Sequence, residues 1–262
     1  MHFVHISDTH LDRDPNFMVE DLDFTINEGA RALIAQINAL PFTPDFVLHT
    51  GDVAYDPIPE AYETVRALFA TLKYPIYYVA GNHDHPVALQ RFLMGRGESE
   101  IVTPLHYEFA VNGVQVVCVD SNGPVEPPRG FMTDDQLTYL EQVCTADDER
   151  PLVIAVHHNV LKVGVPWLDD FMGITNAEDF HQIVVKGRHR LRGVFHGHTH
   201  QNMETLRDGV LYSGVLSSWR QYHAYPGQEE TIEDDQAEPG FNVVTITGEQ
   251  TFIRRHRFAV PG

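Results

Sequence analysis

Short apolar runs recur along the chain, each bounded by glycine, proline or polar residues. They are rich in β-branched residues and too short for ordinary helices, which is typical of strands buried in a sheet. The pattern predicts strands at residues 3–6, 46–48, 76–79, 114–119, 152–156 and 194–195.

Helical patterns fill most of the intervals between these runs. The predicted helices cover residues 29–40, 59–72, 87–94, 133–144 and 176–186. Thr133 and Asn176 stand where a side chain could cap the first turn of a helix. Because strand and helix alternate, we predict a layered α/β sandwich.

The C-terminal part reads differently. Residues 221–240 carry prolines, glycines and an acid-rich run, which predicts a long surface loop. Two interpretations of this loop are open: a solvated connection, or a mobile flap over a functional site. Apolar residues at 241–246 and 251–255 then predict a β-hairpin that closes the fold within residues 241–257.

Composition favours a single domain spanning residues 1–262, because a chain with 43% hydrophobic residues can bury one large core. A formal net charge of −19 opposes binding to long nucleic acid without a local basic patch. Cys118 and Cys144 lie within an apolar run and a helical pattern, so we expect buried free thiols.

Targeting signals are not evident in the sequence. The first predicted strand begins soon after Met1, and no stretch approaches the roughly 18 apolar residues that a membrane helix needs. We therefore expect a cytoplasmic protein with no membrane partner.

Polar motifs follow five of the predicted strands. They are Asp8-Thr9-His10, Gly51-Asp52, Gly81-Asn82-His83-Asp84, His157-His158 and Gly197-His198-Thr199-His200. Loops at the carboxyl ends of strands form the natural crevice of an α/β sheet. Carboxylate, carboxamide and imidazole groups suit divalent transition ions, so the motifs together predict a two-metal site.

Within these motifs, Gly51, Gly81 and Gly197 are expected to adopt backbone angles that aim the ligand after each of them. Asp52 is the best bridging candidate, because each of its two oxygens could hold a different cation.

As a set, the motifs resemble the signature of the calcineurin-like metallophosphoesterase superfamily: D-x-H, G-D, G-N-H-D/E, H and G-H-x-H. The stretch from Ile6 to His10 and the His157-His158 pair are most similar to bacterial class III cyclic-nucleotide and glycerophosphodiester phosphodiesterases. The resemblance implies a four-layer α/β/β/α sandwich of two mixed β-sheets flanked by helices, with the site at the carboxyl ends of the strands. It also implies a homodimer.

The resemblance further implies a role for each site residue. One metal would be held by Asp8, His10, Asp52 and His200, and the other by Asp52, Asn82, His157 and His198. His83 would face the substrate phosphate, and Asp84 would orient the His83 ring. Iron, manganese, zinc and cobalt all accept such ligands.

Two departures from these relatives leave the substrate open: Asn159-Val160 replaces a usual Pro-Pro, and His85 follows Asp84. His158, Trp167 and Arg220 are candidate substrate contacts. Each also has a structural interpretation: His158 as a packing residue, Trp167 as an anchor of its loop, and Arg220 as a surface charge. The same alternatives apply to Phe171 and Arg129.

The predicted reaction is hydrolysis of a small phosphodiester, either a 3′,5′-cyclic nucleotide such as cAMP or a glycerophosphodiester. Two cations roughly 3.5–4 Å apart would share a hydroxide that attacks phosphorus in line, and a centre charge of about +1 suits a monoanionic diester. His83 would assist the leaving group. The alternatives are a phosphomonoesterase or short-end nuclease, and a non-catalytic protein-binding scaffold.

Overall fold

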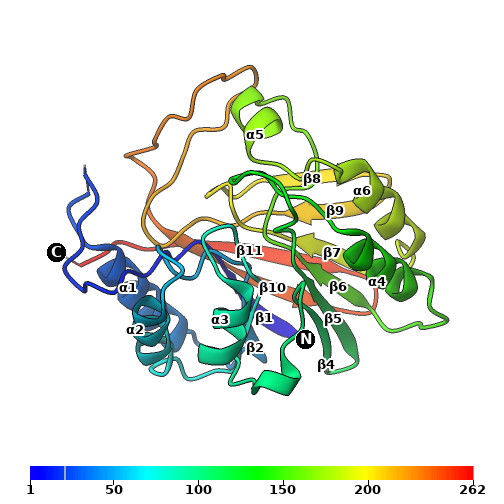
Figure 1. The fold of residues 1–262 in the computed structure, drawn as a ribbon, viewed down its shortest axis with the longest axis horizontal. Coiled ribbons are helices and arrows are strands. Elements are labelled where there is room, and N and C mark those ends of the chain that lie inside the picture. The colour runs from blue at the N-terminus through cyan, green and yellow to red at the C-terminus, as the bar shows by residue number, and fades with distance from the viewer. Residues whose placement is uncertain (21, 262) are drawn as a thin grey trace.

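Two mixed β-sheets pack face to face in the computed structural model, which describes residues 1–20 and 22–261 (Figure 1). The first sheet has the order β11-β10-β1-β2-β3. Its strands are β1 (His2–Ile6), β2 (Phe46–His49), β3 (Ile76–Tyr78), β10 (Gly240–Ile246) and β11 (Thr251–Arg257). Strands β1, β2 and β3 run parallel, so their carboxyl ends share one edge of the sheet.

The second sheet has the order β4-β5-β6-β7-β9-β8. Its strands are β4 (His106–Val111), β5 (Val114–Val119), β6 (Leu152–Ala155), β7 (Leu191–Phe195), β8 (Glu204–Arg207) and β9 (Val210–Ser213). Strands β5, β6, β7 and β9 are parallel, and β4 and β8 are antiparallel edge strands.

Helices cover the outer face of each sheet (Figure 1). The first sheet carries α1 (Ile26–Asn38), α2 (Pro59–Phe69) and α3 (Pro86–Phe92), and the second carries α4 (Asp134–Thr145) and α6 (Ala177–Lys186). A short helix, α5 (Pro166–Phe171), lies beside the long loop, and a 3-10 turn covers Glu98–Glu100. The predicted four-layer α/β/β/α sandwich is confirmed.

Three apolar clusters hold the layers together. One lies between the sheets, where Phe3 stacks on Phe46 with ring centroids 5.2 Å apart and Phe195 of the second sheet meets Phe3 edge to face. The other two lie between each sheet and its helices. Cys118 and Cys144 are buried free thiols within these clusters, as predicted.

Local signals were right at most element positions and wrong at a few. Thr133 caps α4 by accepting from the Gln136 N–H, but the Asn176 side chain makes no cap bond and instead pairs with both backbone groups of Met132. Strands β4, β8 and β9 and helix α5 were not predicted.

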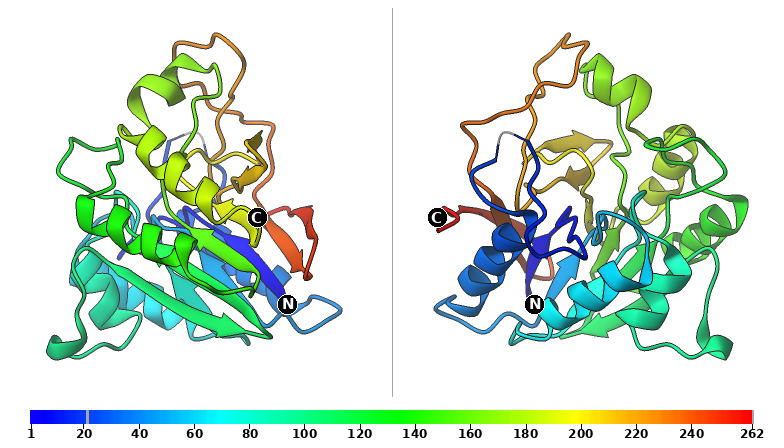
Figure 2. Two further views of the ribbon diagram at one scale, coloured as in Figure 1. Left: turned by 90° about the vertical axis from the view of Figure 1, so that its right-hand side faces the viewer. Right: turned by 60° about the vertical axis from the view of Figure 1, so that its left-hand side comes forward.

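The loop from residue 221 to 239 is irregular apart from one isolated bridge, between Tyr222 and Glu233. It lies together with α5 at one end of the molecule in both views of Figure 2. Backbone bonds join the two segments: Trp167 N–H to Gln228 O, and Gly227 N–H to Gly164 O. The loop is therefore bound to the segment around α5, and the ring of Tyr222 at its start lies 5.2 Å from that of His200, centroid to centroid.

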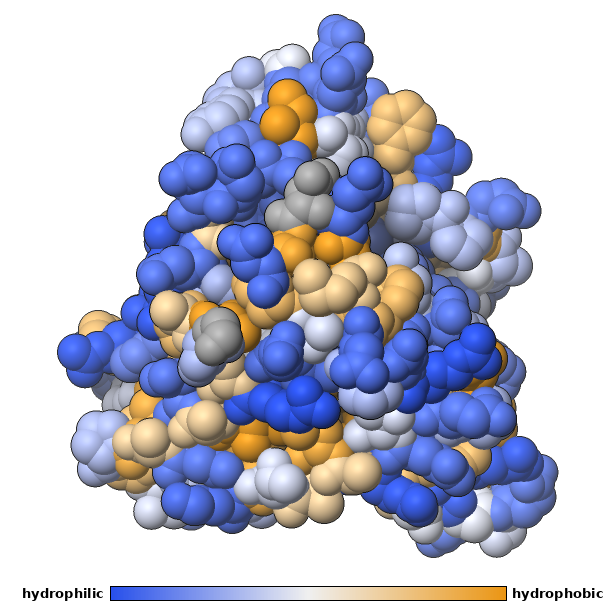
Figure 3. Space-filling model, turned by 90° about the vertical axis from the view of Figure 1, so that its left-hand side faces the viewer, coloured by the Kyte–Doolittle hydropathy of each residue, from blue (hydrophilic) through white to orange (hydrophobic). Residues whose placement is uncertain are grey.

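The surface is mostly hydrophilic on the face drawn in Figure 3. Hydrophobic side chains form separated patches between the hydrophilic ones. Within the described ranges 1–20 and 22–261, the helices are all too short or too polar to cross a membrane.

Candidate metal centre

Five polar motifs converge where the carboxyl ends of the two sheets meet. Asp8 follows β1, Asp52 follows β2 and Asn82 follows β3, while His157 follows β6 and His198 and His200 follow β7. The two halves touch directly, since the backbone N–H of His198 donates to the Asp8 carboxylate at 2.9 Å. The predicted assembly of these distant segments is therefore present.

The backbone is unusual where it carries these side chains. Asp8, His10, Asp52, His198 and His200 all have positive φ angles, between 44° and 68°. Residues other than glycine adopt this left-handed conformation rarely, and such residues concentrate at functional sites. The turns thus place the side chains at a conformational cost.

The glycines act differently from the prediction. Only Gly51 has a positive φ, of 103°. Gly81 and Gly197 are required for space instead, because a Cβ on Gly81 would overlap the Asp52 carboxylate and one on Gly197 would overlap the Ser7 side chain. At these two positions the prediction of special backbone angles is wrong.

Asp52 lies between two groups of imidazoles. Its Oδ2 is 3.5 Å from His10 Nε2 and 3.3 Å from His157 Nε2. Its Oδ1 accepts the backbone N–H of His83 at 2.8 Å. One oxygen therefore faces both groups, which differs from the expectation that each oxygen of Asp52 holds a different cation.

The two groups match the chemistry of metal ligands. Asp8, His10 and His200 present ligand atoms within 4.8 Å of one another, and so do Asp8, Asp52 and His157. Asn82 Oδ1 lies 3.0 Å from His157 Nε2. All of these side chains are buried except that of Asn82, which is half-buried.

Hydrogen bonds fix which ring nitrogen of two histidines faces the carboxylates of the site. His157 Nδ1 pairs with Thr50 O at 2.7 Å, and His200 Nδ1 pairs with Arg220 O at 2.7 Å. A backbone carbonyl only accepts, so Nδ1 carries a proton in both rings and Nε2 is the nitrogen available to a metal. Burial opposes protonation of His157, but Asp52 and Asp8 outweigh it and raise the pKa of His157 to about 9, so a metal would displace a proton from its Nε2. Both Nε2 atoms lie beside carboxylates, at Asp52 and Asp8 respectively.

Buried ring nitrogens without hydrogen-bond partners also indicate metal binding. Both ring nitrogens of His10 and Nε2 of His198 are buried without a hydrogen-bond partner. A buried polar group without a partner is destabilising, by about 1–3 kcal/mol. Metal coordination would satisfy these atoms, so the residues present fit metal ions.

Burial and neighbouring charge shape the ionisation of the site. Burial lowers the pKa of His10 to about 3, so its ring is neutral and able to coordinate. Burial would raise the pKa of Asp8, but the neighbouring His200 and His157 together outweigh it and the net pKa is lowered. Burial likewise opposes ionisation of Asp52, but the surrounding histidines, His157 foremost, together outweigh it, so the pKa of Asp52 is well below its ordinary value. Both carboxylates are therefore charged.

His83 lines the cleft over these ligands and is half-buried. Its Nδ1 pairs with Tyr55 O at 2.9 Å, and its ring centroid is 4.7 Å from that of His10. Tyr55 thus orients the ring, and the predicted role of Asp84 in orienting it is wrong.

Asp84 instead braces two loops. Its backbone N–H donates to Gly81 O at 3.0 Å, which turns the carboxylate back to accept the N–H groups of Gly81, Val53 and Ala54. Burial, reinforced by Asp52, raises the pKa of Asp84 to about 7. The carboxyl group connects the turns that carry Asp52 and Asn82.

Two predicted substrate contacts do not reach the cleft. His158 is fully buried with Nδ1 2.6 Å from Ser121 Oγ. Trp167 is 2% exposed and packs with Val165 and Leu168 as an anchor of its loop. Trp167 is therefore corrected from a substrate contact to a packing residue. His158 is corrected to a buried residue whose Nε2 has no hydrogen-bond partner and one of whose ring nitrogens lies in a group with ligand atoms of His157 and His198.

Of the remaining candidates, only Arg220 lines the cleft. Its Nη1 is 2.8 Å from a Glu233 oxygen, and its Nη2 donates to Glu20 O at 2.7 Å. Phe171 is exposed and does not line the cleft, and the Arg129 guanidinium lies over its ring.

Some residues of the site carried no sequence signal. Ser217 Oγ and Trp219 Nε1 both donate to the carbonyl of Asp8, at 3.0 and 3.1 Å, and so support the strained turn of that ligand. They follow β9, which was not predicted, so nothing placed them near β1.

The cleft measures about 250 Å³. Its walls combine the metal-ligand candidates with aromatic and apolar side chains. They are His10, Val19, Asp52, Tyr55, Asn82, His83, Pro128, Met172, His198, His200, Trp219, Arg220 and Tyr222.

Comparison with known proteins agrees with this geometry. Residues 1–202 match the family described as calcineurin-like phosphoesterase. The chain is 29% identical to the 3′,5′-cyclic adenosine monophosphate phosphodiesterase CpdA of Vibrio vulnificus (strain CMCP6), over 92% of this chain and 84% of that protein. It is 26% identical to the glycerophosphodiester phosphodiesterase GpdQ of Enterobacter lignolyticus (strain SCF1), over 99% of this chain and 92% of that protein.

The fold is also similar to that of a solved dimetal phosphatase from Danio rerio, with a TM-score of 0.69, 14% identity, and coverage of 98% of this chain and 96% of that one. Fold, clustered ligands and family match agree: the chain belongs to the calcineurin-like phosphoesterase family and is a metal-dependent phosphodiester hydrolase.

Proposed function

We propose that the protein hydrolyses small phosphodiesters, either 3′,5′-cyclic nucleotides or glycerophosphodiesters, at a dinuclear metal centre. The single observation that carries the proposal is the position of Asp52 Oδ2, which lies within 3.5 Å of both His10 Nε2 and His157 Nε2 and so faces both sets of proposed ligands. The two relatives described above, named for these two diester classes, support the choice of substrate.

We assign the ligands in two overlapping sets. Asp8, His10, Asp52 and His200 would hold one ion, and Asp52, Asn82, His157 and His198 the other. Ligands of this type accept iron, manganese, zinc or cobalt. Two bound cations would supply Lewis-acid activation of water and neutralise the phosphoryl oxygens.

The protein's own residues supply the rest of the chemistry. Because Nδ1 of His83 donates to Tyr55 O, the imidazolium form would carry its second proton on Nε2. We assign this N–H to the departing alkoxide, which needs a proton or charge stabilisation. Asp52 supports the arrangement by holding the backbone of His83.

The cleft suits a small substrate better than a polymer. Its volume of about 250 Å³ is modest, and a protein with a net charge of −19 repels a long polyanion. Tyr55 and Tyr222 offer aromatic surface to the organic part of the diester. The homodimer stays a prediction.

The test compares bis(4-nitrophenyl) phosphate with 4-nitrophenyl phosphate on protein reconstituted with Mn²⁺, followed by cAMP and glycerophosphocholine. We expect faster turnover of the bis ester and of at least one natural diester. Much faster hydrolysis of the monoester would overturn the proposal in favour of a phosphomonoesterase. Asp52→Asn is the control, since activity that survives it comes from another enzyme.

A further inference from the structure

One arginine side chain forms part of the wall of the metal cleft. Arg220 is the one lysine or arginine among the described residues that line it. Its backbone carbonyl accepts the Nδ1 proton of His200 at 2.7 Å, so the residue stands directly beside a proposed metal ligand. The Arg220 side chain is only 14% exposed. A charge held at this position acts on any anion that the cleft binds, because it is little screened by water.

Glu233 neutralises this arginine from outside the cleft. Its carboxylate lies 2.8 Å from Arg220 Nη1, but Glu233 is not among the residues that line the cleft. It belongs to the acidic loop, and its side chain is 44% exposed. The ion pair therefore adds little net charge to the wall.

Two other contacts hold the guanidinium in the wall. Arg220 Nη2 donates to the Glu20 carbonyl at 2.7 Å, and the guanidinium carbon lies 5.2 Å from the centroid of the Trp219 ring. The same ring meets those of His10 and His200 edge to face, with centroids 5.4 and 5.9 Å away. Because these contacts do not involve the carboxylate of the ion pair, a neutral residue in its place would leave the arginine in the wall with its charge uncompensated.

The charge of the centre decides which phosphate ester it suits. A centre charge of about +1 suits a monoanionic diester. An uncompensated Arg220 would raise the local charge to about +2, which suits a dianionic monoester. The attraction of a fixed cation is proportional to the charge of the ligand, so a dianion would gain about twice as much free energy from it as a monoanion.

We propose that Glu233 is a specificity-determining residue, which keeps the site selective for diesters by cancelling the charge of Arg220. The inference rests on the proposed function, because it concerns the same centre and the same reaction. Glu233 acts through Arg220, so it is a positioning residue. Its removal should change the preference between two anions and leave the metal content unchanged.

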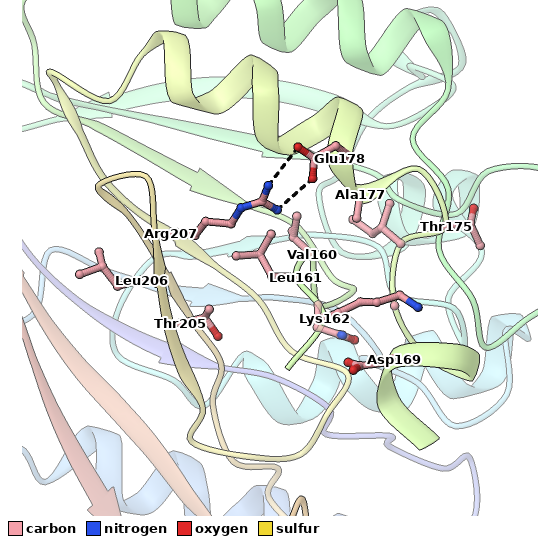
Figure 4. A pocket seen from close by; sticks show the side chains of 13 residues that line it. Val160, Leu161, Lys162, Asp169, Thr175, Ala177, Glu178, Thr205, Leu206 and Arg207 are labelled. Carbon is pink, nitrogen blue, oxygen red and sulfur yellow. Dashed lines mark hydrogen bonds and ion pairs between the residues drawn. The ribbon is translucent and has the colours of Figure 1, made fainter. Parts of the chain in front are cut away.

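The experiment measures the binding of two anions that cannot be hydrolysed to the Mn²⁺-loaded full chain by isothermal titration calorimetry, which does not depend on turnover. Inorganic phosphate is mostly dianionic at a pH above its second pKa, and dimethylphosphinate is monoanionic. Glu233→Gln removes the charge at nearly constant volume. Glu178→Gln is the matched control, because Glu178 forms a two-point ion pair with Arg207 in a separate hollow, with contacts of 2.9 and 3.0 Å (Figure 4). Thermal melting and metal content confirm that each variant is folded and loaded.

In Glu233→Gln, the affinity for phosphate relative to that for dimethylphosphinate should rise about fivefold. The kcat/KM for 4-nitrophenyl phosphate relative to that for bis(4-nitrophenyl) phosphate should rise by a similar factor. Ratios are compared because a loosened Arg220 would weaken both ligands alike. Glu178→Gln and the charge-conserving Glu233→Asp should keep the ratios of the parent. So should the double variant Arg220→Gln/Glu233→Gln, which removes the cation as well.

The inference is overturned if Glu233→Gln keeps the binding ratio of the parent, or if neither protein binds phosphate. It is also overturned if Glu178→Gln shifts the ratio equally, or if the shift persists in the double variant. Glu233→Gln and Glu178→Gln alone decide if the double variant does not fold. A parent protein that hydrolyses the monoester much faster would overturn the proposed function instead, and the binding ratios would still test the role of Glu233.

Discussion

The Glu233 carboxylate lies 2.8 Å from Arg220 Nη1 and ties the acidic loop to the wall of the metal cleft. The carbonyl of the same arginine accepts the Nδ1 proton of His200. The side chain of residue 220 thus meets the loop while its backbone meets a proposed metal ligand. The loop is therefore attached to the cleft wall at Glu233, inside the loop as well as at its ends. Of the two interpretations left by the sequence, a connection held beside the cleft agrees better with this contact than a freely mobile flap.

Breaking this ion pair should affect substrate binding more than folding. Glu233→Gln removes one charge of a partly exposed pair, so we expect a loss of stability below about 1 kcal/mol. KM should rise about two- to fivefold as Arg220 loses its anchor. Steady-state kinetics and thermal melting check this, with Glu178→Gln as control, since Glu178 also pairs with an arginine but lies outside the cleft. An equal rise in KM in both variants would contradict the prediction.

Removing the metals should abolish activity without unfolding the protein. The three apolar clusters do not depend on the metal centre, so the chelated protein should keep its circular dichroism spectrum. It should melt about 5–10 °C lower, as expected for loss of a ligand at about a hundred times its Kd. Returning Mn²⁺ should restore both melting temperature and turnover. A chelated protein that keeps full turnover would rule out the metal assignment.

His83 should matter most for poor leaving groups. His83→Ala should lower kcat for glycerophosphocholine or cAMP by about a hundredfold or more, the usual contribution of a positioned acid. The loss should be smaller for bis(4-nitrophenyl) phosphate, whose phenolate departs unaided. Metal content, measured by elemental analysis, should not change. His85→Ala is the control, because the neighbouring His85 only caps α3; equal losses on both diesters would indicate a positioning defect instead.

Buried neutral histidines should make the metal-free protein sensitive to acid. Burial lowers the pKa of His49 to about 3, and its Nδ1 accepts the N–H of Gly51 at 3.2 Å. When the pH is below the ordinary histidine pKa of about 6.5, His49 binds a proton in the unfolded chain but stays neutral in the folded one. Stability should therefore fall as the pH falls from about 6.5, by up to about 1.4 kcal/mol per pH unit for this one group.

Urea unfolding of EDTA-treated protein between pH 7.5 and 5 measures this slope. His49→Gln should reduce it by the contribution of one proton, and His2→Gln, at an exposed position, should leave it unchanged. Identical slopes in all three proteins would show that His49 is not the group responsible.

The convergence of the proposed ligands was predictable because each of them follows a short strand, or stands two residues after one that does, and the apolar pattern of these strands is clear. A glycine before Asp52, Asn82 and His198 marked the turn, although only Gly51 needs its special backbone angle. What sequence spacing could not supply was the direction of each side chain. Asp84 stands next to His83, but its turn points the carboxylate at Val53 and Ala54.

The other omissions have similar causes. Strand β8 is mostly exposed and β4 alternates between half-buried and exposed positions, so neither shows the apolar run of a central strand. Because β8 and β9 were not predicted, Ser217 and Trp219 could not be placed near the site. Their contacts with Asp8 join residues more than two hundred positions apart. Such contacts depend on sheet order, which local patterns do not encode.

The left-handed turns at the centre have one more consequence. Each non-glycine residue in that conformation costs about 1–3 kcal/mol, so these turns lower the stability of the metal-free folded protein. Replacing His10 by glycine should relieve the backbone strain at this position while removing a proposed ligand. The metal-free variant should then melt at a higher temperature than the metal-free parent, in a calorimetric comparison, although it is inert. A substitution that raises the thermal stability of this turn would thus remove the catalytic activity that the turn makes possible.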